Sequence, residues 1–429
     1  MSTSSIPATP RMTPQDYQAF DDLFALSSSI GATQAGGLHR LTASAADKQM
    51  RDAFCSWLAQ QGFSIRIDEI GNIFGLMTLR EGAPWILCGS HLDSQPLGGR
   101  FDGAYGVTGA AATIAALVRQ LKELPEAAQR NLAVVNWTNE EGARFQPSLT
   151  GSSVFTGAMT LAQALACEDS DGVTLQSALH SIGYCGETLP ALPLAAYLEL
   201  HVEQGPHLEQ QSMQIGVVTE TWAALKWQVT FRGEQNHTGP ALMPRRRDAL
   251  LAAAQTIVAV RAAAERYGEV LHTSVGRLET APNSPNVVTR EATVFIEFRS
   301  ADEALLQQLR DSFSQQLLEI AQQTATDVSL DRAQLRPRQQ LHHGLSQLAL
   351  AQAHKLGLSA MPMRTVAGHD AISLSYVCPS ALLFVPSVNG LSHNEQEFTA
   401  EQDLHRGLDL LMALLSELCL SPYALEETS

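Results

Sequence analysis

The chain has 429 residues, of which 45% are hydrophobic and 17% charged, a balance typical of a globular protein. This length favours two domains, or one large domain with an insertion, and it can bury a large core. The formal net charge of −16 argues against non-specific binding to nucleic acid or to an anionic membrane surface.

The sequence indicates no targeting or membrane-spanning segment. Residues 1–11 are rich in Ser, Thr and Pro but lack the apolar stretch and positive charge of a secretion signal. No apolar run approaches the length of a membrane span. The six cysteines are scattered and form no C-x-x-C pair, which favours reduced thiols. We therefore expect a cytoplasmic protein that acts without a membrane or nucleic-acid partner.

Predicted helices and strands alternate through the first half of the chain. Helical periodicity covers residues 13–30 and 105–124, and Pro125 ends the second helix. Three apolar segments are predicted strands, at residues 85–88, 131–137 and 196–202. Each strand is followed by polar residues. Since ligands bind at the carboxyl ends of strands in open α/β sheets, these polar residues are candidates for a site.

The pattern changes between residues 216 and 330. Strands are predicted at 225–231 and 287–298, and amphipathic helices at 248–267 and 302–324. Ser300 and Glu303 suit a capping box for the second helix. This order of strands and helices is typical of a small α/β sandwich with its helices on one face.

The remaining elements complete a discontinuous first domain. A helix is predicted at 344–356, a strand at 381–385, and a last helix starting near Thr399. We therefore predict an α/β protein with a catalytic domain over residues 1–215 and 331–429. A smaller domain over residues 216–330 is inserted into it.

Five short segments carry side chains suited to a hydrolytic metal site. They are His91-Leu92-Asp93, Gly98 to Gly106 around Asp102, Asn139-Glu140-Glu141-Gly142, Glu199 to Pro206 with His201, and Ser392 to Glu395 with His393. Each segment alone also fits an ordinary polar loop or a solvated strand end. Together they supply enough imidazole and carboxylate ligands for a pair of divalent ions, such as Zn²⁺ or Mn²⁺.

In two of these segments, nearby residues are suited to different chemical roles. Asp93, two residues after His91 on an extended chain, can accept a hydrogen bond from that ring and fix its tautomer. Glu140 and Glu141 follow an apolar run, so one acid can bind metal while the other moves a proton. A nucleophile mechanism is weaker, because Ser152 lies in no G-x-S-x-G motif.

Taken in order, these segments resemble the M20 metallopeptidase and amidohydrolase family. Within it they are similar to N-carbamoyl-L-amino-acid hydrolases, β-ureidopropionases and allantoate amidohydrolases. The matching stretches span residues 89–398 and are GSHLDSQPLGGRFDGAYGV, NWTNEEGARFQPSLTGS, LELHVEQGPHLE, NHTGP, RRRDAL, AGHDA and LSHNEQEF. The implied fold is a mixed-sheet, zinc-peptidase-like catalytic domain with an inserted α/β sandwich that serves as lid and dimerisation domain.

The resemblance also implies the metal ligands. Asp102 would bridge two divalent ions, Zn²⁺ or Mn²⁺, with Co²⁺ or Ni²⁺ as alternatives. His91 and His201 would complete one site, and Glu141 and His393 the other. Glu140 would be the general base and later the proton donor.

Substrate-binding roles follow from the same resemblance. In the inserted domain, His237 would reach the substrate carbonyl, across a homodimer interface. Asn286 and Arg299 would hold a substrate carboxylate. A list of residues from the larger domain completes the pocket: Gln204, Gly368 and His369. Val366 is bulkier than the family's usual residue, and residues 219–224 lack the expected hinge glycines.

The expected reaction is hydrolysis of a ureido C–N bond. His201 favours the carbamoylase branch, because the peptidase branch usually has Asp there. The substrate would be an N-carbamoyl amino acid or N-carbamoyl-β-alanine, giving amino acid, CO₂ and ammonia. Three alternatives stay open: an allantoate or ureidoglycolate amidohydrolase, an aminoacylase or dipeptidase, and an inactive binding protein on the same fold.

Overall fold

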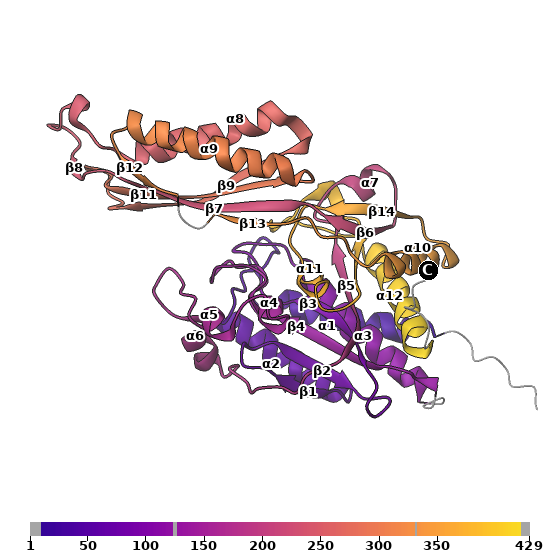
Figure 1. The fold of residues 1–429 in the computed structure, drawn as a ribbon. Helices are drawn as coiled ribbons and strands as arrows, with labels where there is room; N and C mark the ends of the chain where they lie inside the picture. The colour runs from indigo at the N-terminus through magenta and orange to yellow at the C-terminus, as the bar shows by residue number, and fades with distance from the viewer. Residues whose placement is uncertain (1–9, 123–126, 331–332, 422–429) are drawn as a thin grey trace, which may run out of the picture. The chain divides into compact units, whose positions relative to one another are not determined.

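The computed structural model describes residues 10–122, 127–330 and 333–421, and it divides into two compact units. The first unit takes the described residues of Met1–Thr219, Leu341–Met363 and Gly368–Ser429. The second takes those of Glu220–Gln340 and Arg364–Ala367. Figure 1 shows the elements of both. Pro125, the predicted helix stop, lies outside the described residues.

An eight-stranded mixed sheet organises the first unit, in the order β1-β2-β4-β3-β5-β15-β6-β14. The strands are β1 (Ser64–Ile67), β2 (Ile73–Met77), β3 (Trp85–His91), β4 (Asn131–Trp137), β5 (Leu194–Val202), β6 (Ile215–Thr221), β14 (Ala360–Thr365) and β15 (Ser380–Val385). The central strands β4, β3, β5 and β15 run parallel, while β2 pairs antiparallel with β4 and β6 pairs antiparallel with β15. The carboxyl ends of the four parallel strands therefore lie along one edge of the sheet.

The parallel strands are buried on both faces, which explains their nearly continuous apolar sequences. Along β4, Leu132 and Val134 pack into one apolar cluster, whereas Ala133, Val135 and Trp137 pack into another. Successive side chains of a strand point to opposite faces. The predicted strand 131–137 is thus found with the same bounds.

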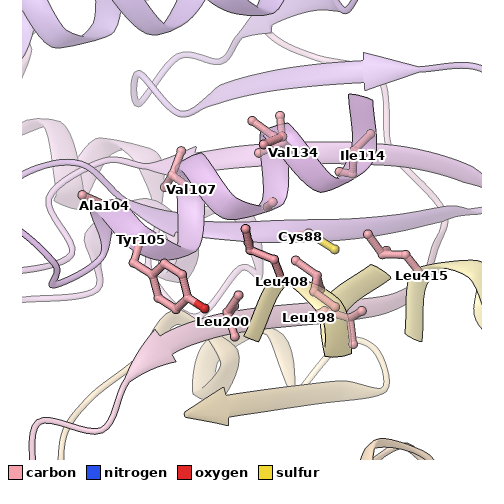
Figure 2. Close-up of a cluster of buried hydrophobic side chains, with 14 of the residues drawn as sticks. Cys88, Ala104, Tyr105, Val107, Ile114, Val134, Leu198, Leu200, Leu408 and Leu415 are labelled. Atoms are coloured by element: carbon pink, nitrogen blue, oxygen red, sulfur yellow. The ribbon is translucent and has the colours of Figure 1, made fainter. Parts of the chain in front are cut away.

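Helices cover the sheet of the first unit. They are α1 (Pro14–Ser29), α2 (Ala45–Gln60), α3 (Ala104–Leu121), α4 (Thr150–Phe155), α5 (Leu161–Leu165), α6 (Leu175–Ile182), α7 (His207–Gln210), α10 (His343–Lys355), α11 (Asp370–Leu374) and α12 (Glu401–Leu420). Helix α3 packs against α1, α12 and the strands β3 to β5. Figure 2 shows this contact, with Val107, Leu200 and Leu408 among the buried side chains.

The second unit is an antiparallel sheet with two long helices. Its strands, in the order β12-β7-β11-β9 with β13 also paired to β7, are β7 (Ala223–Arg232), β9 (His272–Ala281), β11 (Glu291–Ser300), β12 (Asp327–Ser329) and β13 (Gln334–Arg336). Helices α8 (Ala249–Tyr267) and α9 (Glu303–Gln323) lie on one face (Figure 1) and share its apolar core. A separate ribbon joins β8 (Asn236–His237) and β10 (Val287–Val288).

The mixed α/β fold class predicted from the sequence is confirmed, but two local predictions are wrong. The strand predicted at 287–298 is broken, since Thr289 and Arg290 separate β10 from β11. The cap of α9 is Asp302, whose carboxylate accepts from Ala304 N and Leu305 N, so Ser300 is not the capping residue. The last helix, α12, is found close to its predicted start near Thr399, since it begins at Glu401.

Among the described residues, no helix is both long enough and apolar enough to cross a membrane.

Candidate active site

The carboxyl ends of the four parallel strands bring the predicted site residues together. His91 ends β3, and Asp102 lies in the loop between that strand and α3. Glu140 and Glu141 follow β4, His201 is the penultimate residue of β5, and His393 follows β15. Five of these residues form two groups that share Asp102, and within each group the ligand atoms lie within 4.8 Å of one another. One group is His91, Asp102 and His201, and the other is Asp102, Glu141 and His393.

Asp102 lies at the centre of this arrangement and belongs to both groups. Its Oδ1 is 3.1 Å from Nε2 of His201 and 3.5 Å from Nε2 of His91. Its Oδ2 is 3.2 Å from Nε2 of His393, which is itself 3.4 Å from Oε2 of Glu141. Ligand atoms about 2.1 Å from one tetrahedral ion are roughly 3.4 Å apart, so these spacings suit a cation on each side of Asp102.

Main-chain carbonyls orient two of the imidazole rings. Nδ1 of His91 lies 2.9 Å from the carbonyl oxygen of Asp93, and Nδ1 of His201 lies 2.9 Å from that of Val202. Each ring therefore donates a proton from Nδ1 and directs its Nε2 towards Asp102. The carboxylate of Asp93 is farther from His91, at 3.6 Å, and accepts instead from Thr42 Oγ1. The predicted partner residue is present, but its carbonyl makes the shorter contact.

The two adjacent acids after β4 occupy different positions. Glu141 accepts from the main chain and side chain of Gln95 and faces His393. Glu140 is 8% exposed, and its Oε2 lies 3.5 Å from Nε2 of His91. The backbone just before Glu140 is unusual, because Asn139 has a positive φ of 56°. This geometry leaves Glu140 beside the centre rather than within either ligand group.

The charges of the site fit bound cations. Burial, together with the nearby negative charge of Asp102, raises the pKa of Glu141 to about 7. Burial also raises the pKa of Glu140 well above its usual value, although His91 opposes the change. For Asp102, hydrogen bonds from the three histidines outweigh burial and hold the pKa well below its usual range. Buried carboxylates need cationic partners, and the donor set is the one that divalent transition metals prefer.

Three residues predicted to line the pocket from the first unit lie near this centre. Gln204 donates from Nε2 to Oδ2 of Asp102 at 2.8 Å. His369 is 1% exposed and packs edge-on against His201, with ring centroids 4.7 Å apart. Gly368 precedes His369 in the chain and is partly buried. Gln204 thus contacts a predicted metal ligand directly.

The catalytic candidate His237 and the substrate-binding candidates Asn286 and Arg299 lie in the second unit, where they do not form one cluster. His237 and Asn286 are exposed on the ribbon of β8 and β10, with Thr238 N donating to Asn286 O. Gly239 N donates to Nδ1 of His237, so the ring proton is on Nε2. Arg299 lies in β11, where it donates to the carbonyl of Val366 and pairs with Glu297 at 3.0 Å.

Sequence reasoning missed several buried acids around the site. Glu199 accepts from Ser90 and Ala371 N, and Asp370 lies nearby with no exposure. Glu397 accepts from the backbone of Asp102. The alternation of ionisable residues at 199, 201 and 203 signalled Glu199, but no pattern marked Glu397.

Gly103 provides a test of how tightly the site is built. It has a φ of 64°, and an added Cβ would lie 2.4 Å from the His91 ring. We expect Gly103→Ala to displace that ring and abolish high-affinity cation binding, measured by equilibrium dialysis. Gly157→Ala is the matched control, because Gly157 has a φ of 77° but open space around it. Both variants place a side chain at a positive φ, but only the first should lose cations.

The fold and site together define a class of protein, a two-unit α/β hydrolase whose parallel strands gather imidazole and carboxylate ligands around one shared Asp. The chain belongs to Peptidase family M20/M25/M40, which matches residues 87–417. The predicted family resemblance is therefore confirmed, and the protein is a hydrolase of C–N bonds.

Its relatives cover nearly the whole chain. An N-carbamoyl-L-amino-acid amidohydrolase of Rhizobium meliloti is 35% identical over 91% of this chain and 93% of its own length. A putative hydrolase of Mycolicibacterium smegmatis is 43% identical over 93% of this chain and 92% of its own length. An allantoate amidohydrolase of Escherichia coli is 31% identical over 94% of this chain and 98% of its own length.

A solved structure has the same fold. It is a hydantoinase/carbamoylase family amidase of Burkholderia vietnamiensis, which is 33% identical, with a TM-score of 0.91 over 98% of this chain and 100% of that one. The chain is thus an amidohydrolase of the family's carbamoylase and allantoate branch.

Proposed function

We propose that this enzyme hydrolyses the ureido C–N bond of an N-carbamoyl amino acid, of the α or the β-alanine type. The observation that carries the proposal is the sharing of Asp102 by two groups of metal ligands, with Glu140 beside them. The name of the Rhizobium relative supports the substrate class. Release of ammonia and CO₂ would leave the free amino acid.

We assign the ligands by their positions around Asp102. His91 and His201 would hold one cation with Oδ1, while Glu141 and His393 would hold a second with Oδ2. Zn²⁺ or Mn²⁺ suits these donors, and Co²⁺ or Ni²⁺ are alternatives. When bound, such cations lower the pKa of water and polarise a carbonyl.

Glu140 is our candidate for the proton carrier. It is buried 3.5 Å from His91 and outside both ligand groups, so its carboxylate remains available for chemistry. We propose that it takes a proton from the attacking water and delivers it to the departing nitrogen. The raised pKa that burial gives this carboxyl favours holding the proton between the two steps.

The second unit supplies groups for the rest of the substrate. His237, with its proton on Nε2, would donate to the oxyanion, and Arg299 would bind the substrate carboxylate through two parallel hydrogen bonds. Arg299 is paired with Glu297 in the structure, so a substrate carboxylate would have to displace Glu297. Asn286, whose backbone carbonyl accepts from Thr238 N, would join Arg299 in holding the substrate carboxylate.

The spacing of these residues supports a homodimer. Arg299 and Glu291 lie at opposite ends of β11, about 26 Å apart at roughly 3.3 Å per residue. The ribbon that carries His237 lies beyond the Glu291 end (Figure 1), since Glu291 pairs with Arg232 of β7. One substrate cannot contact Arg299 and His237 of a single chain over that span. We propose that His237 and Asn286 act in the site of a partner subunit.

An uncovered sheet edge in the second unit suits the same homodimer. Strand β9 is ten residues long and ends the described sheet, paired on one side only with β11. Long unpaired edges invite pairing with another strand. Exposed apolar residues of α8, Leu251 and Val258, lie in the same unit. A second copy pairing at this edge would cover them and extend the sheet.

Arg299→Ala tests the carboxylate role. Loss of a charge-assisted pair costs about 1.5–3 kcal/mol, so we expect KM to rise about 10- to 100-fold with kcat changed less. The control is Arg232→Ala, which removes an exposed arginine paired with Glu291 on the neighbouring strand. An unchanged KM for Arg299→Ala would reject the role.

The substrate class is tested with the purified enzyme and added Zn²⁺, Mn²⁺, Co²⁺ or Ni²⁺. We expect ammonia release from N-carbamoyl-α-amino acids or N-carbamoyl-β-alanine. Faster turnover of allantoate or ureidoglycolate would favour the function named for other relatives. Amine release from N-acyl amino acids or dipeptides would instead identify an aminoacylase or dipeptidase. An inactive binding protein would turn over none of them.

We also propose a cytoplasmic location. All six cysteines are free in the structure, including the buried Cys88, Cys378 and Cys419. Free thiols are typical of reducing compartments.

A further inference from the structure

A closed ring of hydrogen bonds begins and ends on Asp102. Oε2 of Glu397 accepts from the main-chain N–H groups of Phe101, at 3.1 Å, and Asp102, at 3.2 Å. Oε1 of Glu397 accepts from Ser392 Oγ at 2.7 Å. Nε2 of Gln204 donates to Ser392 Oγ at 3.1 Å and to Oδ2 of Asp102 at 2.8 Å. The ring therefore fixes both the backbone and the carboxylate of Asp102.

Glu397 is closely enclosed by the loop that it holds. It is 4% exposed, and a Cβ added at Gly99 would lie 2.0 Å from its Oε2. A buried carboxylate without hydrogen-bond donors would cost several kcal/mol, and here three donors satisfy it. The glycine and the acid thus fit one another, which indicates a built interaction rather than a chance contact.

The ring connects Asp102 with the most exposed of the predicted metal ligands, His393. His91 and His201 have side chains only 2% exposed and are oriented by their own neighbouring carbonyls. His393 has a side chain that is 50% exposed and a backbone φ of 52°. It lies between Ser392 and Glu397 in the chain, so the ring ties its loop to Asp102.

We propose that Glu397 is a positioning residue, which with Ser392 and Gln204 aims Oδ2 of Asp102 at the cation on the His393 side. This inference rests on the proposed two-cation function. Glu397 would not contact the cation. It would set the affinity for that ion by holding Asp102 and the His393 loop in register, as hydrogen-bonded partners of metal ligands do elsewhere.

The test is Mn²⁺ binding to the metal-free, full-length protein, counted by equilibrium dialysis. For the wild type we expect two Mn²⁺ per chain. Glu397→Gln keeps the shape of the side chain but places an amide where an acceptor is needed. We expect it to weaken the second Mn²⁺ about 10- to 100-fold and the first one less. Turnover of the variant should recover at saturating Mn²⁺, which a general folding defect would not allow.

Two further variants keep the test decisive. Ser392→Ala removes one hydroxyl from the ring and should weaken the second Mn²⁺ in the same direction even if Glu397→Gln fails to fold. Gln396→Ala changes the exposed residue beside Glu397 and should bind both ions as the wild type does. Unchanged affinity for the second ion in Glu397→Gln or in Ser392→Ala overturns the inference. A wild type that binds a single Mn²⁺ overturns the paired-cation proposal instead, and the inference with it.

Discussion

Glu140→Gln is expected to lower kcat by about 10²- to 10⁴-fold, the usual loss for a missing acid–base group. The amide has nearly the same shape as the acid but cannot carry the proton from water to the departing nitrogen. Because Glu140 lies outside both ligand groups, the variant should keep the metal content of the wild type. Steady-state turnover and metal analysis of the same sample measure both effects.

Two comparisons make that result specific. Glu141→Gln changes a predicted ligand, so it should lose bound metal as well as turnover. Glu168→Gln changes an exposed acid of the same unit and should alter neither. If Glu140→Gln turned over substrate at the wild-type rate, another group would have to move the proton.

Mixing two impaired variants should restore activity, assayed at a substrate concentration well below KM. His237→Ala removes the proposed oxyanion donor, with an expected loss of about 10²- to 10³-fold in kcat, and Arg299→Ala removes the proposed partner of the substrate carboxylate. In a dimer that contains one chain of each, one site carries both changes and the other carries neither. Random exchange makes half of the dimers mixed, so about a quarter of the wild-type activity should return.

The mixing experiment also excludes the single-chain alternative. If His237 served its own chain, every site in the mixture would carry one change and no activity would return. Exchange must be shown independently, for example by two affinity tags that co-purify. Arg232→Ala mixed with His237→Ala is the control, because Arg232 has no proposed role in the site.

The sequence predicted the parts of the fold that depend on apolar runs. Strand 131–137 is buried on both faces, so its hydrophobic pattern is continuous and its bounds were recognisable. The carboxyl ends of the parallel strands then had to lie along one edge, which placed His91, Glu140 and His201 near one another. Their convergence on Asp102 followed from strand order rather than from any single motif.

Features set by loop conformation were not predictable in this way. Glu397 lies four residues after His393 and has the composition of a solvated turn, but the backbone of Asp102 binds it. The carbonyl of Asp93 rather than its carboxylate makes the shorter contact with His91, and composition carries no information about main-chain direction. The break between β10 and β11 likewise separates two segments of similar apolar character.

The discontinuity of the first unit has a consequence for its biosynthesis. Helix α3 is covered by α12, whose apolar residues Leu408, Leu411 and Leu415 belong to the same core. On a ribosome, that covering helix emerges only after Glu220–Gln340 has been translated. The contiguous second unit can fold as it appears, since domains generally fold as units during translation. The nascent first unit, however, leaves the apolar face of α3 exposed to solvent until α12 has been translated.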